Sequence, residues 1–255
     1  MKKLLKWGLI AVGVLVVLIV VFWLFFLNGA IRIGVEKGGM YATDRTTTLN
    51  AANLSIMNGT LDLSSLSMDN PKGYSMPVFL NLKECKVTVQ PSSLLAGTVN
   101  VPEISMDGLE ITLEQNGLKN NLAEILDVIQ RKTSAGNTTG NTQGASSPGK
   151  KLQIGVIRMT GTKVHIKAVT EMTLDLGPIE IKEPTNPDGR PMKIADVIGK
   201  VLISVAKQIA DNPQVPGGLK DGLGSVNKLF GDSGKQLQGG LNDATKGLQD
   251  MFKKH

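Results

Sequence analysis

The stretch ISMDGLEITLE, residues 104–114, indicates the fold most directly. From residue 109 onward, Leu109, Ile111 and Leu113 alternate with two glutamates and a threonine. Because successive side chains of a strand point to opposite faces, this alternation predicts a strand with one apolar and one polar face. The Asp107-Gly108 pair before it is typical of a tight hairpin turn, so we expect a separate strand at 99–106.

Three more strands are predicted before this turn, at residues 49–56, 61–68 and 79–89. The Asn58-Gly59 pair is a second hairpin signal. The apolar alternation changes phase between Leu63 and Leu66, and again between Leu82 and Cys85. We interpret both changes as β-bulges that curve the sheet.

After residue 120 the apolar period changes to that of a helix. Residues 121–130 carry an apolar stripe on every third or fourth residue and predict a short amphipathic helix. Strands are expected again at 152–159, 163–169, 172–176 and 179–181. The second and third of these carry basic and acidic outer residues respectively, which favours antiparallel pairing between them. A second amphipathic helix is predicted from Pro191 to Asp211.

These elements predict an α+β fold with a curved, groove-like, mostly antiparallel sheet, two covering amphipathic helices and an amphipathic C-terminal tail. We divide the chain into a transmembrane anchor (1–27), a β module with a closing helix (28–131), a flexible linker (132–150), continuation strands with the second helix (151–212), and a glycine-rich tail (213–255). The linker is predicted from its Gly, Ser, Thr and Asn content.

The anchor is predicted from Trp7 to Leu27, an apolar run of 21 residues. As a helix it would reach about 32 Å, enough to cross a bilayer. Lysines precede the run, so we expect an uncleaved signal anchor with a cytoplasmic N-terminus in a bacterial inner membrane and the rest of the chain in the periplasm. The alternative is a cleavable signal peptide, whose apolar core is shorter, about 7 to 15 residues.

The tail repeats its apolar residues at intervals of 11. Its stripe consists of Leu219, Val226, Phe230, Leu237, Leu241, Leu248 and Phe252. Such a period keeps one apolar face on a helix, whereas each glycine costs about 1 kcal/mol relative to alanine. We therefore expect the tail to fold on contact with a membrane surface. The alternatives are packing against its own domain or a helical assembly.

The sequence contains no recognisable catalytic constellation. Cys85 is the only cysteine, and His165 and His255 are the only histidines, so we predict no catalytic residues, no metal site, no disulfide and no cofactor. The net charge of +6 is spread without a Lys/Arg block, which argues against nucleic-acid binding.

The order of several motifs resembles the opening module of AsmA-like bacterial envelope proteins. The motifs are LSIMNGTLDLSSLSMDNPKGY at 54–74, SSLLAG at 92–97, ISMDGLEI at 104–111 and NNLAEIL at 120–126. The resemblance covers roughly residues 4–130. It implies a bent antiparallel sheet with an apolar inner face, related to the chorein-type modules of bridge-like lipid transporters and tethered to the inner membrane. The chain is short compared with the large members, so a groove across the whole envelope is not expected.

The apolar sheet face must be covered either by the two helices, giving a closed core, or by lipid acyl chains. The candidate lipid-groove residues are Leu61, Leu63, Leu109, Ile111, Leu113, Val164, Ile166, Met172, Leu174 and Leu176. The function we expect is that of a noncatalytic membrane protein that binds membrane lipids or helps to transfer them. The alternative is a structural or assembly factor whose tail recruits an envelope protein partner.

Overall fold

The structure is a computed structural model that describes residues 14–15, 26–117, 119–135, 151–168, 171–186, 192–220 and 223. Most of the expected anchor, residues 136–150 of the expected linker, Pro191 and the tail beyond residue 223 lie outside these described residues. Among the helices that are described, none has the length and apolar content needed to cross a membrane.

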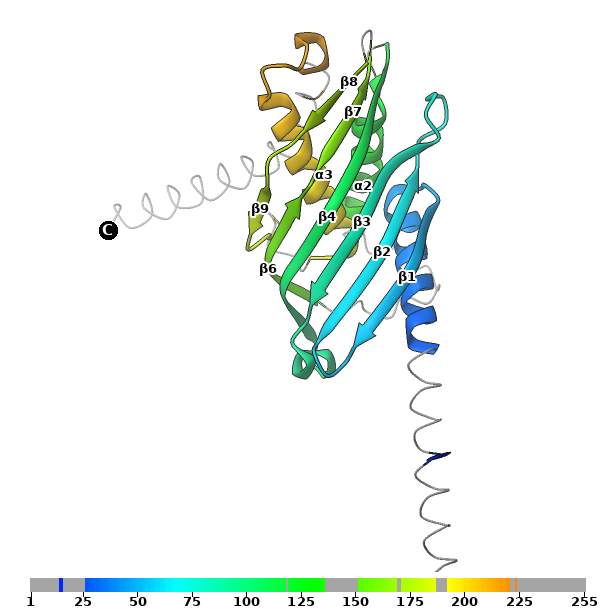
Figure 1. Cartoon of the computed structure of the whole chain (residues 1–255), viewed down its shortest axis with the longest axis vertical. Coiled ribbons are helices and arrows are strands. Elements are labelled where there is room, and N and C mark those ends of the chain that lie inside the picture. Colours follow the sequence, from blue (N-terminus) through cyan, green and yellow to red (C-terminus); the bar gives the residue numbers. More distant parts are fainter. Residues whose placement is uncertain are drawn as a thin grey trace, which may run out of the picture.

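The described chain forms one curved sheet with helices on one side (Figure 1). Its strands are β1 (Thr47–Ser55), β2 (Thr60–Asp69), β3 (Val78–Thr88), β4 (Thr98–Asn116), β5 (Lys119–Asn120), β6 (Lys151–Thr160), β7 (Lys163–Lys167), β8 (Glu171–Asp175) and β9 (Ile179–Lys182). The order across the sheet is β1-β2-β3-β4-β6-β9, with β7 beside the second half of β4 and β8 beside β7. The α+β class is therefore confirmed.

The predicted turn at Asp107-Gly108 is wrong, because β4 runs through it as one strand of 19 residues. β3 pairs with β4 on both sides of this point, with Glu84 opposite Asp107 and Leu82 opposite Leu109. Gly108 has a φ of +66° and lies where a Cβ would come within 2.9 Å of the Lys83 Cβ. The Asp-Gly pair therefore makes a kink that only glycine adopts easily, while neighbours on both sides keep the strand extended.

The kink crosses the sheet from strand to strand. Ser65 in β2, Gly108 in β4 and Gly161 between β6 and β7 all have positive φ, and we call them the kink line. The predicted changes of phase are confirmed, since Leu82 and Cys85, three residues apart, are both buried in the core. Their interpretation as bulges is wrong. No residue is inserted, because the pairing register of β2 with β3 is the same before and after Ser65.

The sheet is mixed and mostly antiparallel, as predicted. β4 pairs in parallel with β6 and β7, whereas all the other neighbours are antiparallel. Parallel neighbours need a long crossover, and the helix α2 (Asn121–Ala135) lies in the chain between β5 and β6. The predicted pairing of β7 with β8 is confirmed, with Lys163 opposite Asp175.

Two helices lie over the apolar face, which we call the inner face (Figure 1). α2 continues to Ala135, five residues beyond the predicted helix, into the segment predicted as linker. α3 (Ile194–Asp211) begins at Ile194 instead of Pro191, because Lys193 is extended and its N–H donates to Asp196 Oδ2 at 2.7 Å. The helices touch at Gly199, where a Cβ would lie 3.3 Å from Ile129 Cγ2.

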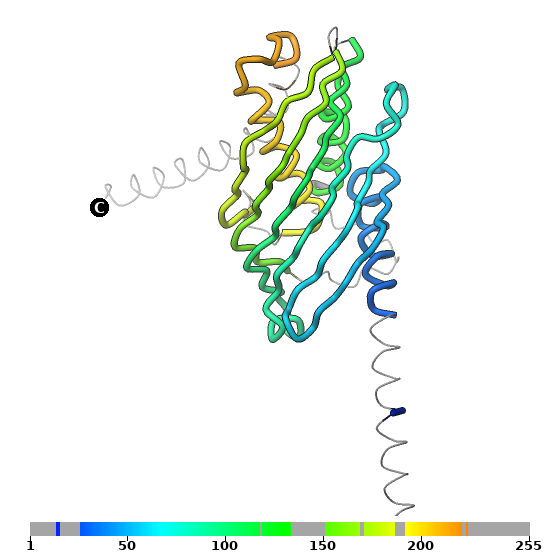
Figure 2. Tube along the Cα trace, viewed as in Figure 1, coloured from blue at the N-terminus to red at the C-terminus, as the bar shows by residue number. Residues whose placement is uncertain are grey.

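A further helix, residues 26–43, runs beside β1 in the opposite direction (Figure 2). The backbone N–H of Leu54 donates to Asn28 Oδ1, and that of Leu49 donates to Glu36 Oε1, each at 3.0 Å. The Leu49 hydrogen bond and the adjacent Arg32 hold the pKa of Glu36 below its usual value. These side chains satisfy N–H groups that an edge strand otherwise leaves free to pair with another chain.

Candidate lipid-contacting surface

The kink line divides the inner face into two halves. The upper half, as seen in Figure 1, contains six of the groove candidates: Leu109, Ile111, Leu113, Val164, Ile166 and Leu174. Each is at most 2 % exposed. They share one core with Leu122, Ile125 and Ile129 of α2, so this half is closed by the protein itself. Met172 and Leu176 are half-buried against the same core.

The apolar side chains of the lower half are covered unevenly by the rest of the protein. Its strand register aligns one apolar residue per strand, which we call the lower row: Leu54, Leu61, Val87, Ile104, Ile157 and Ile181. Ile157 is fully buried, whereas Leu54, Leu61 and Val87 keep part of their surface exposed. Leu63 lies in the neighbouring row and is 9 % exposed. Ile181, at the far end of the row, is also partly exposed, so the buried members are Ile104 and Ile157 in the middle.

The lower row starts beside the helix of residues 26–43. Leu54, its first member, is the residue whose N–H donates to Asn28 Oδ1. Ile31 and Val35 of the same helix pack against the core from this side. The partly exposed apolar surface therefore begins where the expected anchor ends, at Leu27.

Cys85 lies in the lower half, in the row of Leu63, directly opposite Leu63 of β2 and Met106 of β4. Its side chain is buried at 7 % exposure. Burial, helped by the charge of Asp62, raises the pKa of its thiol to about 12. A thiol with such a pKa is a poor nucleophile at neutral pH, so Cys85 acts here as a small apolar residue.

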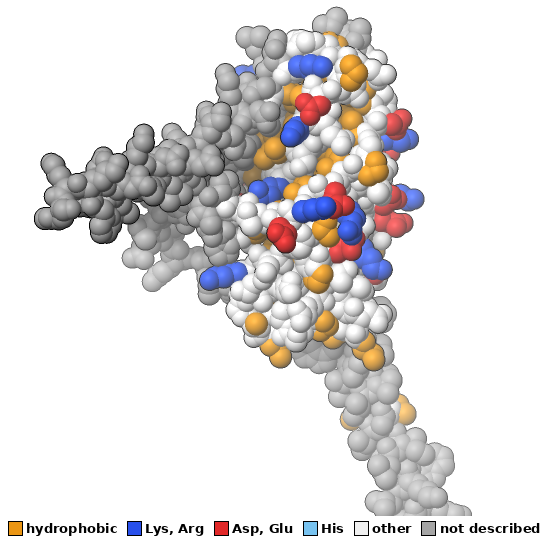
Figure 3. Space-filling view, turned by 90° about the vertical axis from the view of Figure 1, so that its left-hand side faces the viewer, with side chains coloured by type: hydrophobic (Ala, Val, Ile, Leu, Met, Phe, Trp, Pro, Cys, Tyr) orange, Lys and Arg blue, Asp and Glu red, His pale blue; other side chains and the backbone are white. Residues whose placement is uncertain are grey.

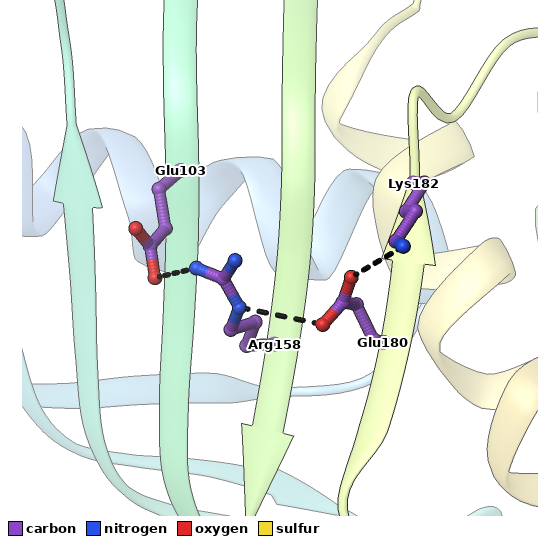
Figure 4. A network of polar contacts seen from close by, with 4 residues as sticks. All are labelled: Glu103, Arg158, Glu180 and Lys182. Atoms are coloured by element: carbon purple, nitrogen blue, oxygen red, sulfur yellow. Dashed lines mark hydrogen bonds and ion pairs between the residues drawn. The ribbon is translucent and has the colours of Figure 1, made fainter.

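The opposite, outer face carries the charges. Arg158 Nη1 donates to Glu103 Oε1 at 2.7 Å, and Arg158 Nε lies 3.5 Å from Glu180 Oε2 (Figure 4). Glu180 also forms an ion pair with Lys182, whose Nζ lies 3.4 Å from Glu180 Oε1. The hydrogen bond from Arg158 to Glu103 raises the pKa of the guanidinium further. These exposed pairs stabilise little individually, but they make the outer face hydrophilic from β4 to β9.

No cluster of three or more His, Cys, Asp or Glu that could hold a metal occurs among the described residues. His165 is on the outer face, with Nδ1 3.1 Å from Thr173 Oγ1. Its position between two lysines of β7 is that of a surface strand residue.

Only the start of the predicted tail stripe is described. Leu219 is 2 % exposed and belongs to the core, together with Val215 and Leu223. At this position the chain packs against its own domain, so Leu219 does not reach a membrane surface in this structure. The stripe residues from Val226 to Phe252 lie outside the described residues.

Sequence reasoning missed part of this surface. Leu54, Val87 and Met106 were absent from the predicted groove, although they share the inner face with Leu61 and Leu63. The change of phase at residues 63–66 and 82–85 was the signal for these residues. It places apolar residues of neighbouring strands opposite one another in the lower half.

A single curved sheet with one apolar face, one charged face and helices on the apolar side defines an α+β module suited to binding or scaffolding. The comparison with protein families identifies the family to which this module belongs. The model of the AsmA family matches residues 1–201, so the chain belongs to the AsmA family. No curated protein matched the chain. Family membership supports an envelope-associated protein, and the match extends past the expected 4–130 into α3.

Proposed function

We propose that the protein is a noncatalytic envelope protein, anchored in the bacterial inner membrane with its bulk in the periplasm, that binds lipid acyl chains on the lower row. The observation that carries the proposal is the contrast in burial along one apolar face. Ile111 and Val164 are fully buried, whereas Leu61 and Val87 are only partly covered.

The physical reason is the cost of leaving apolar surface in water. Covering it is worth about 25 cal/mol per Å², or about 0.8 kcal/mol for each buried CH₂ of an acyl chain. Lipids are the apolar molecules closest to this surface, because the row begins beside Asn28, the residue after the expected anchor. A lipid leaving the bilayer at this point would meet Leu54 and Leu61 first.

The test compares two cross-strand charge pairs in the full-length protein. Leu61→Lys with Val87→Glu places a pair on the inner face, at directly opposite positions of β2 and β3. Ser67→Lys with Asn81→Glu places the same pair on the outer face of the same strands. We expect lipids that co-purify in mild detergent, measured by mass spectrometry, to fall several-fold in the first variant only.

Circular dichroism must show that both variants are folded. Equal lipid content in the two folded variants would contradict binding at the lower row. Absence of any co-purified lipid from the unmodified protein would favour the alternative, an assembly factor that recruits a protein partner through residues 213–255.

A further inference from the structure

Two loops at the lower end of the sheet expose large apolar side chains to solvent. The turn between β1 and β2 carries Ile56 and Met57, which are 49 % and 97 % exposed. The 3₁₀ helix η1 (Pro91–Leu95) carries Leu94 and Leu95, which are 39 % and 96 % exposed. We call these four residues the apolar tip.

The two loops are held together as one surface. The backbone N–H of Val89 donates to the carbonyl of Gly59 at 2.7 Å. Gly59 has a φ of +62° and approaches Pro91 so closely that a Cβ would lie 3.0 Å from its Cδ. The apolar side chains of both loops therefore occupy one end of a rigid sheet.

The tip also lacks charge. Residues 55–60 and 90–98 contain no Asp, Glu, Lys or Arg. Figure 3 shows the same property on the surface, where the lower end carries hydrophobic side chains and the charged ones gather higher up. A solvent-facing loop normally mixes polar and charged residues, and an uncharged apolar end is typical of a contact surface.

The position of the tip indicates its partner. β1 runs toward the tip, and near its end the N–H of Leu54 donates to Asn28 Oδ1. The helix that contains Asn28 starts at the tip end of the sheet, and the apolar run of residues 7–27 directly precedes it (Figure 1). A bilayer crossed by that run would therefore meet the tip before any other part of the domain.

We propose that the apolar tip inserts into the interface of the bilayer that residues 7–27 cross. The inference rests on the anchor of the proposed function, and it is independent of lipid binding at the lower row. The anchor and the tip together make two attachments, which fix the sheet upright and hold the lower row next to the membrane. Leucine and methionine suit this contact, because the strength of interfacial binding scales with the apolar area that is buried.

The experiment uses full-length protein in phosphatidylethanolamine–phosphatidylglycerol vesicles, with single cysteines labelled by an environment-sensitive fluorophore. The background variant is Cys85→Ala, which removes the buried thiol. Met57→Cys and Leu95→Cys probe the tip, Leu15→Cys probes the anchor, and Met76→Cys, at the other end of the sheet, is the matched control at 39 % exposure. Lipids with nitroxides near the headgroup or deep in the chain quench labels within the bilayer.

We expect shallow nitroxides to quench the labels at residues 57 and 95 at least threefold more than the label at 76, while deep nitroxides quench the label at 15. Quenching at 15 without quenching at 57 and 95 would overturn the tip insertion and leave the anchor intact. Absence of quenching at 15 would overturn the anchor and the inference with it. Tip labels shielded from aqueous iodide but not quenched by lipid would show a protein cover and would also overturn the inference.

Discussion

The upper and lower halves of the inner face are built from the same strands but are covered differently. In the upper half Ile111 and Leu113 are completely buried beneath helices, whereas in the lower half Leu61 and Val87 stay partly exposed. The inner-face residues named here are apolar in both halves. The contrast shows that alternation identifies an apolar face, while the elements packed on it decide whether that face is a core or a contact surface.

The largest effect is expected from charging the upper half. Ile111→Asp with Leu174→Asp places two carboxylates opposite Val164, and all three of these side chains are at most 2 % exposed. Burying an unpaired charge costs on the order of 3 to 5 kcal/mol. The cost of two such charges is comparable with the whole free energy of unfolding of a domain. We expect loss of the cooperative thermal transition, measured by circular dichroism.

The control for that variant is Thr112→Asp with Thr173→Asp, on the outer face of the same strands. It should keep the transition within a few degrees of the unmodified protein. A cooperative, unshifted transition in the Ile111 and Leu174 variant would show that the upper half is accessible, and the contrast between the halves would disappear.

A smaller effect is expected at Glu114, which fixes the upper end of β4. Its carboxylate accepts the N–H groups of Ser75 at 2.7 Å and Met76 at 3.0 Å. Burial alone would raise the pKa of Glu114, but these two hydrogen bonds hold it below 4.5. Hydrogen bonds to a charged group contribute about 1.5 to 3 kcal/mol, so Glu114→Gln should cost about 2 kcal/mol at pH 7 in urea unfolding.

The pH dependence follows from the direction of that shift. Because the folded-state pKa lies below the unfolded value, the stabilisation is complete above about pH 4.5 and is lost as the pH falls through the folded-state pKa. The difference between Glu114→Gln and the unmodified protein should therefore shrink below pH 4.5. Glu110→Gln, on the exposed outer face of β4, serves as the control, and a constant difference down to pH 3 would contradict this role.

The strand positions could be predicted because each alternating segment carries its own local signal. The continuation of β4 through the kink at Gly108 could not, since Asp-Gly is a turn signal unless β3 and β6 hold the strand on both sides. The parallel pairing of β4 with β6 was also hidden, because pairing order depends on contacts between distant segments. For the same reason the sequence named Leu61 and Ile111 as equal groove candidates, although only one lies beneath helices.

The kink line between the halves gives the next prediction. Gly108→Ala puts a side chain at a φ of +66°, with its Cβ 2.9 Å from the Lys83 Cβ. A left-handed conformation costs a residue with a Cβ about 1 to 2 kcal/mol. Because the close approach of Lys83 adds to this cost, we expect a larger loss than this in urea unfolding, together with weaker amide protection on both sides of residue 108. Gly117→Ala, at a φ of +62° with no atom within 4 Å, controls for φ alone.

An equal cost in the two glycine variants would mean that the approach of Lys83 adds nothing and that the kink is a purely local feature. A larger cost at Gly108 would show that the kink line is a packed boundary shared by neighbouring strands.

Ser65→Gly, at a φ of 55° in β2, should act in the opposite direction. Because glycine adopts a positive φ without steric cost, we expect this substitution to stabilise the protein slightly in urea unfolding.

The smallest effect on stability is expected in the lower half, from Leu61→Lys with Val87→Glu. The two side chains are directly opposite on β2 and β3 and only half-buried, so the new charges can reach water and each other. We expect a loss of about 1 kcal/mol or less in urea unfolding, since a cross-strand pair of opposite charge offsets part of the lost apolar burial. The neighbouring outer pair, Asp62 and Lys86, already has this arrangement, with Nζ 3.9 Å from Oδ1. If this variant unfolds like the Ile111 and Leu174 variant, the lower half is a closed core as well, and binding of acyl chains there would require the sheet face to open first.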